Sequence, residues 1–173
     1  SRRSITPYSR RVSFEKRSPL SGQGDVAAAL RELLAAVDAN GEDADGMYPP
    51  TSTEIRLYVG LLAAHRGDAG AVAEMLRRTR DSRIVRDYPT VAQLQRVLLA
   101  EQDRLAGKPQ AAIDRLAPLA KQETSLVAVH WALERAARSA GDAALANEQH
   151  QWLRTHRGRV YAESTTTDLL RFF

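Results

Sequence analysis

Apolar residues recur along most of this chain at the three- and four-residue intervals of an amphipathic α-helix. In the first such stretch, Val26, Leu30 and Leu33 lie on one face of the helix that the pattern predicts. Outside the first twenty residues, no stretch keeps the two-residue period of a β-strand. We therefore predict an all-α protein of about seven helices. The predicted helices span residues 25–37, 51–66, 68–76, 89–106, 109–119, 125–140 and 142–153.

A short phrase built around a glycine separates several of these helices. It reads GQGDVAAALREL, HRGDAGAVAEML, LAGKPQAAIDRL and SAGDAALANEQH, with marker glycines at positions 24, 67, 107 and 141. Because glycine adopts the left-handed conformation that ends a helix, we predict positive φ angles at Gly67, Gly107 and Gly141. Such short links force neighbouring helices to be antiparallel, and the spacings of 43, 40 and 34 residues are typical of a helical repeat.

Residues next to the predicted helix ends refine the boundaries. Asp68 and Asp142 are predicted N-caps, and Pro109 suits the first turn of its helix. Ser125 is predicted to open the helix that follows. Pro118 is expected to kink or end its helix, because a proline in a helix interior costs about 3 kcal/mol.

Small and large residues around the glycines follow a further pattern. Ala112 and Leu116 lie five and nine positions after Gly107, and Gly60 and Ala100 lie seven positions before their turn glycines. With this pattern, residues 24–157 resemble the tetratricopeptide repeat (TPR) family in a degenerate form. The resemblance implies a right-handed superhelical stack of antiparallel helix pairs, a TPR-like α-solenoid. In such a stack, small residues let paired helices approach closely.

Two positions depart from the family pattern. Glu134 stands where the family has a small residue, and His150 stands where it has a large apolar one. The chain also lacks the lysine and asparagine clamp with which chaperone-binding TPR proteins hold a carboxylate, so we exclude that ligand class. The corresponding positions are Leu57, Leu61, Val97 and Glu101.

The resemblance also implies a concave groove, lined by the first helix of each pair, that holds a peptide or protein segment. Its arginines are suited to gripping a carboxylate or an acidic segment, because the guanidinium donates in a fork. An equally strong interpretation pairs these arginines with neighbouring glutamates along the surface. The groove residues that we predict are Tyr58, His65, Glu101, Arg104, Trp131, Arg135 and Arg138.

Charge and composition divide the chain into three parts. Residues 1–24, rich in serine with Pro7 and Pro19, are interpreted as an extended basic arm or linker. Residues 25–160 are interpreted as the TPR-like domain, and residues 161–173 as a tail that forms a short capping helix. The chain has a formal net charge of +4. The excess lies in the arm, at Arg2, Arg3, Arg10, Arg11, Lys16 and Arg17.

A second basic feature supports an alternative function. The stretch RRTRDSRIVRDYP is interpreted as a linker between helices. The simplest interpretation of its arginines is that they lie at a solvated helix C-terminus, where cations interact favourably with the helix dipole. The alternative is that this cluster and the arm bind nucleic acid or another anionic surface, with affinity that falls steeply with salt. The cluster consists of Arg77, Arg78, Arg80, Arg83 and Arg86.

Catalysis, cofactors and metal ions find no support in the sequence. The chain has no cysteine, and its four histidines form no HExxH pair. The acidic stretch DANGEDADGMY lacks the ligand order of a calcium loop, and no phosphate-binding loop or nucleophile elbow is present. We therefore expect a non-catalytic protein without cofactor or metal. An enzyme is the most remote interpretation.

The function that we expect is a protein-interaction or scaffold module, the C-terminal part of a larger bacterial signalling or assembly protein. The partner is a protein or peptide, and nucleic acid is the less favoured alternative. No run reaches the roughly 18 apolar residues that a membrane span needs, so we predict no transmembrane segment. No signal peptide follows the basic start, so we expect a cytoplasmic location, with the bacterial periplasm as the alternative.

Overall fold

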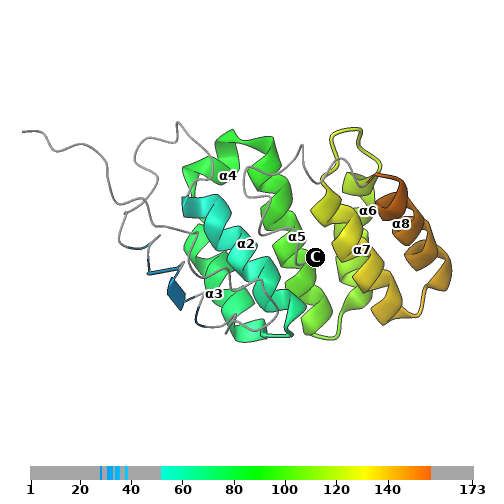
Figure 1. Ribbon diagram of the computed structural model, residues 1–173, viewed down its shortest axis with the longest axis horizontal. Helices are drawn as coiled ribbons and strands as arrows, with labels where there is room; N and C mark the ends of the chain where they lie inside the picture. Colours follow the sequence, from blue (N-terminus) through cyan, green and yellow to red (C-terminus); the bar gives the residue numbers. More distant parts are fainter. Residues whose placement is uncertain (1–27, 29–30, 33, 36–37, 39–51, 157–173) are drawn as a thin grey trace, which may run out of the picture.

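The computed structural model describes residues 52–156 together with residues 28, 31–32, 34–35 and 38 (Figure 1). Within these residues every regular element is helical, seven helices are bounded and no strand occurs, so the prediction of an all-α protein is confirmed there. The predicted arm and the tail at residues 161–173 lie outside the described residues. The helices are α2 (Ser52–His65), α3 (Ala69–Thr79), α4 (Arg83–Asp87), α5 (Pro89–Leu105), α6 (Pro109–Ala120), α7 (Val127–Ala140) and α8 (Ala143–Thr155).

Three glycine turns join α2 to α3, α5 to α6 and α7 to α8. Gly67, Gly107 and Gly141 have φ angles of 77°, 73° and 77°, which confirms the predicted left-handed conformation. Each turn has the same two backbone hydrogen bonds. At the first, the amide of Gly67 donates to the carbonyl of Ala64 at 3.1 Å, and that of Asp68 donates to Ala63 at 2.9 Å. This is the Schellman arrangement, which satisfies the last carbonyls of a helix.

The predicted caps are confirmed where the next helices begin. The Asp68 carboxylate accepts from the amide of Ala71 at 2.9 Å, and the Asp142 carboxylate accepts from the amide of Leu145 at 3.0 Å. Each bond satisfies one of the amides that a helix start leaves without a partner. Pro109 is the first residue of α6, as predicted.

One boundary prediction was wrong. Ser125 does not open α7, which begins at Val127. Instead Ser125 is buried, and the neighbouring amide of Leu126 donates to the side chain of Gln93 at 3.2 Å, so α5 fixes this loop. Pro118 was expected to kink or end α6; the helix does not end there, and Ala120 is its last residue.

The predicted basic linker at residues 77–89 was also wrong in part. The helix α3 extends to Thr79, and the short helix α4 follows it. The hydroxyl of Ser82 caps α4 by accepting from the amide of Ile84 at 3.2 Å, and the Ile84 side chain is buried. The apolar side chains of Ile84 and Val85 thus anchor to the core a segment whose charges suggested a linker.

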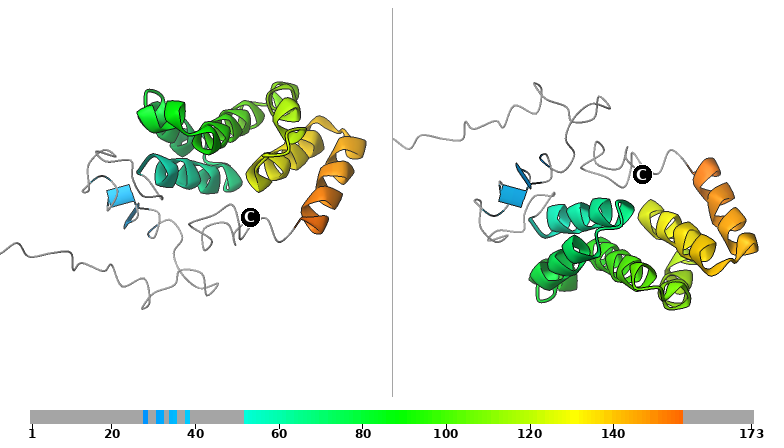
Figure 2. Two further views of the ribbon diagram at one scale, coloured as in Figure 1. Left: turned by 90° about the horizontal axis from the view of Figure 1, so that it is seen from above. Right: turned by 90° about the horizontal axis from the view of Figure 1, so that it is seen from below.

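Helix α5 lies at the centre of the packing. It contacts α2, α3, α4, α6 and α7, while α7 also contacts α6 and α8. The helices α2 and α7 both pack on α5 and meet near the end of α2 (Figure 2). The close approach of α2 to α5 depends on Gly60 of α2, because a Cβ added there would lie 2.5 Å from a methyl carbon of Leu98 on α5. The core so formed consists largely of leucine, valine and alanine.

Candidate functional site

The seven predicted groove residues lie on α2, α5 and α7, the first helices of the three glycine-linked pairs. The structure brings five of them together around the last turn of α2. The other two lie apart: Tyr58 is buried in the core, and Arg138 pairs with Glu134 on α7. The five that meet are His65, Glu101, Arg104, Trp131 and Arg135.

A buried carboxylate is at the centre of this cluster. The Glu101 side chain is 1% exposed, and its Oε2 accepts from Nε and Nη2 of Arg104 at 2.9 and 2.7 Å. Arg135 Nη2 lies 3.8 Å from the same oxygen. Oε1 has no hydrogen-bond partner among the described residues. A buried carboxylate needs paired cations, and the two arginines supply them to Glu101.

Both arginines also reach the end of α2. Arg135 Nη2 donates to the carbonyl oxygen of Ala64 at 3.2 Å, and Arg104 Nη2 donates to the same oxygen at 3.4 Å. The last carbonyls of a helix form the negative end of its dipole, where cations are stabilising. The cluster therefore links α2, α5 and α7 through one carbonyl oxygen and one carboxylate.

Two aromatic rings pack beside Arg135 in this cluster. The guanidinium carbon of Arg135 lies 4.5 Å from the centre of the Trp131 ring, which is the geometry of a cation–π contact. The ring of His65 stacks against Trp131 with centroids 5.8 Å apart. Arg135 Nη1 donates to Nδ1 of His65 at 3.3 Å. Burial lowers the pKa of Arg135, while the charge of Glu101 acts in the opposite direction.

The two departures from the family pattern contact each other. Glu134 Oε1 lies 3.2 Å from Nδ1 of His150, and Arg138 donates to the same oxygen at 3.1 and 2.6 Å. These two positions thus form a polar contact between α7 and α8. Arg138, one of the predicted groove residues, therefore forms an ion pair with Glu134 at the surface.

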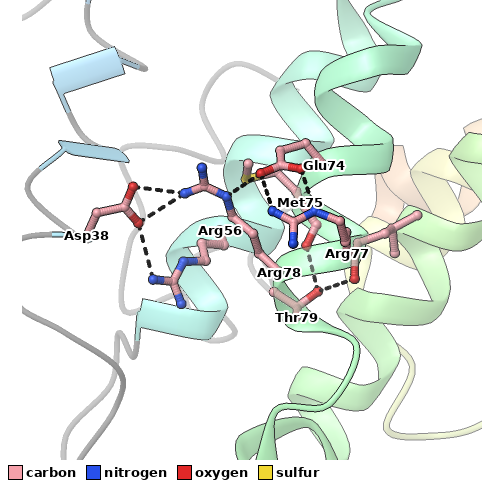
Figure 3. A network of polar contacts seen from close by, with 8 residues as sticks. Asp38, Arg56, Glu74, Met75, Arg77, Arg78 and Thr79 are labelled. Carbon is pink, nitrogen blue, oxygen red and sulfur yellow. Dashed lines mark hydrogen bonds and ion pairs between the residues drawn. The ribbon is translucent and has the colours of Figure 1, made fainter.

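The basic cluster at residues 77–86 is largely matched by carboxylates. Arg77 and Arg78 both bind Glu74 at 2.8 and 2.7 Å, and Arg78 also binds Asp38 at 2.8 Å (Figure 3). The hydrogen bonds from Arg77 and Arg78 lower the pKa of Glu74 to about 2. Arg83 pairs with Asp87 at 2.9 Å. Three of the five arginines are therefore partly neutralised, in agreement with the solvated helix-end interpretation.

A second aromatic cluster, which the sequence analysis did not identify, lies between α7 and α8. His130 is buried, and its Nδ1 lies 2.7 Å from Oε1 of Gln149. Its ring stacks on Trp152 with centroids 3.4 Å apart, and Trp152 stacks on His156 at 4.2 Å. His130 and Gln149 lie on the apolar stripes of their helices, and this position could have predicted from the sequence that both are buried.

Neither metal ligands nor a membrane span emerges from the part of the chain that the structure describes. No three histidine or carboxylate side chains there are grouped as a metal ion would require. None of the helices bounded there is long and apolar enough to cross a membrane. Comparisons of the chain with protein-family models, with curated proteins and with solved structures found no match.

Proposed function

We propose that this chain is a non-catalytic, TPR-like module that binds a peptide or protein segment on the inner face of its helix pairs. The inner face is defined here as the surface of α2, α5 and α7 around His65, Trp131 and Arg135. The proposal rests on one observation above all: the first helices of three successive pairs converge there with partly exposed aromatic and cationic groups.

The order of helix contacts supports a repeat stack. First helices contact first helices, as α2 does α5 and α5 does α7. Second helices contact the first helix of the following pair, as α3 does α5 and α6 does α7. Contacts that repeat between neighbours in this way are expected of a solenoid, in which each unit buries its apolar face on the next.

Small residues and glycine turns support the same architecture. Gly60 lies at a close contact with Leu98, and Ala100, Ala112 and Leu116 are buried in the core. The 40-residue spacing from Gly67 to Gly107 exceeds the TPR period of 34, and the short helix α4 lies within that longer interval. An insertion between pairs leaves the packing inside each pair intact.

Binding on the inner face is tested by selecting peptides from a random library on the immobilised full chain. Affinities of the enriched peptides are then compared for the unaltered chain, Trp131→Ala and Tyr88→Ala. Tyr88 is 46% exposed at the opposite end of α5 from Arg104, so its variant controls for loss of an aromatic ring. We expect Trp131→Ala to weaken binding about tenfold, because interface aromatic residues carry much of the affinity, and Tyr88→Ala to leave it unchanged.

The alternative, binding of nucleic acid through the arm and the 77–86 cluster, makes a different prediction. A fluorescent single-stranded oligonucleotide would bind with an affinity that falls steeply as salt rises. The carboxylate partners of Arg77, Arg78 and Arg83 weaken this alternative, because a phosphate would have to compete with them. Tight oligonucleotide binding with no peptide enrichment would replace the proposed function by the alternative.

A further inference from the structure

Two of the three arginines predicted to grip a partner are already engaged within the chain. Arg104 makes two short hydrogen bonds to Glu101, and Arg138 makes two to Glu134. In each case both bonds go to a single carboxylate oxygen at distances of 2.6 to 3.1 Å. A ligand carboxylate would have to displace these internal partners, so neither arginine is a suitable first contact.

Arg135 differs from both. Its hydrogen bonds run to uncharged acceptors, the carbonyl of Ala64 and Nδ1 of His65. Arginine has only donor groups, so the histidine nitrogen is the acceptor in this hydrogen bond. The separation of 3.8 Å from Glu101 is an ion pair without a hydrogen bond. Packing on Trp131 fixes the guanidinium plane, while 22% of the side chain stays exposed.

The surroundings of Arg135 carry excess positive charge. Arg66 directly follows His65 at the end of α2 and is exposed. Arg138 is one helical turn beyond Arg135 on α7, and its side chain is 58% exposed. The ion pairs of α5 and α7 at this place join Arg104, Arg135 and Arg138 to Glu101 and Glu134, which is one more arginine than carboxylate.

We propose that Arg135 is the anchor for an aspartate or glutamate side chain of the bound segment, so that the inner face selects acidic peptides. This inference rests on the proposed function and adds the chemistry of the partner. A guanidinium held by a carbonyl, an imidazole and an indole is preorganised, so a carboxylate binds it with little loss of side-chain entropy. Trp131 supplies the adjoining apolar contact.

A single guanidinium that shares its counter-ion, Glu101, with Arg104 suits a carboxylate side chain better than a nucleic acid. A strand of nucleic acid presents phosphates at regular intervals and gains affinity from several cations that neutralise them together. Arg104 and Arg138 are already paired with Glu101 and Glu134, so the inner face does not offer a continuous row of available cations to a row of phosphates. A peptide with one or two acidic residues needs only Arg135.

The test uses the library-selected peptides, synthesised with amidated C-termini so that only side-chain carboxylates are present. Each acidic peptide is compared with its counterpart in which Asp becomes Asn and Glu becomes Gln. Binding to the full chain is measured by fluorescence anisotropy for the unaltered chain, Arg135→Gln, Arg135→Lys and Arg83→Gln. Arg83 is 82% exposed on α4 and pairs with Asp87, so Arg83→Gln gives the same change of charge away from the inner face.

We expect enriched peptides to contain acidic residues, and their neutral counterparts to bind at least about tenfold more weakly. Arg135→Gln should remove that preference, and Arg83→Gln should keep it. Arg135→Lys retains the charge beside Glu101 and therefore the fold, yet should weaken the acidic peptides because its ammonium cannot donate in a fork. Enrichment of peptides without acidic residues, or equal loss in Arg83→Gln, would overturn the inference while leaving the proposed function intact. Enrichment of no peptide would contradict both.

Discussion

At the residue scale, Glu101 shows how a groove position can be used inside the protein. The sequence places it on the inner face of α5, where the family resemblance predicts a residue that contacts the ligand. In the structure its carboxylate is buried between Arg104 and Arg135. The structure therefore favours internal pairing, the second of the two interpretations, for Arg104. Arg135, which shares Glu101 with Arg104 without a hydrogen bond to it, could be identified only from the distances.

Replacing Glu101 by alanine is expected to destabilise the fold. The change leaves two partly buried arginines without their shared counter-ion and should lower the free energy of unfolding by about 2–3 kcal/mol. The exposed pair of Arg83 and Asp87 provides the control, and Asp87→Ala should cost less than about 1 kcal/mol. Chemical denaturation of both variants measures the difference. Equal stability of the two variants would mean that the buried pairing contributes nothing.

Glu74 should titrate well below an ordinary glutamate. Its pKa falls to about 2 because the ionised form accepts hydrogen bonds from Arg77 and Arg78. Since the folded-state value is the lower one, the stabilisation is complete above pH 4.5 and is lost as pH falls towards 2. Carboxyl carbon shifts measured by NMR give the midpoint directly. Arg77→Gln should raise that midpoint, whereas a midpoint near 4.5 in the unaltered chain would contradict the ion pairs.

At the scale of elements, turn chemistry was the most reliable signal in the sequence. Aspartate caps and left-handed glycines are local features, so Asp68, Asp142 and all three glycines could be placed without knowledge of the tertiary structure. The helix α4 and the start of α7 could not be predicted in this way. They depend on contacts with distant residues, the burial of Ile84 and the hydrogen bonds of Gln93 to the loop before α7.

The glycine turns can be tested against a matched glycine in a helix. At Gly67, Gly107 and Gly141 an added Cβ meets no atom within 4 Å, so valine there is expected to cost about 1–2 kcal/mol through backbone strain alone. Gly70 lies in the first turn of α3, and a Cβ added there would lie 3.5 Å from Oδ1 of Asp68, its nearest neighbouring atom. Gly70→Ala should therefore stabilise the fold by about 0.5–1 kcal/mol.

Thermal unfolding of these single variants provides the measurement. If the three valine variants matched the unaltered chain, the left-handed turns would not be required. If Gly70→Ala were as damaging as they are, crowding rather than backbone conformation would be the cause.

At the scale of the whole molecule, the three helix pairs within the described residues form one continuous core, and α4 lies between the first and second pairs. The sequence predicted the pairs and their antiparallel links because glycine spacing and apolar periodicity are regular over residues 51–155. It also predicted that seven groove residues would share one surface, and five of them meet around the end of α2. It could not predict that α2 and α7 meet beside α5, because that contact joins residues far apart in the sequence: Arg135 with the carbonyl of Ala64, and Trp131 with His65.

The most direct test of the proposed binding face uses the two tryptophans of the chain as reporters. Trp131 lies on the inner face, and Trp152 stacks between His130 and His156 at the α7–α8 contact. Their indole N–H groups give two resolved signals in a proton–nitrogen correlation spectrum, recorded while a library-selected peptide is added. We predict that the Trp131 signal shifts with saturation while the Trp152 signal stays in place. Saturable binding that leaves the Trp131 signal unmoved would contradict peptide recognition on the inner face.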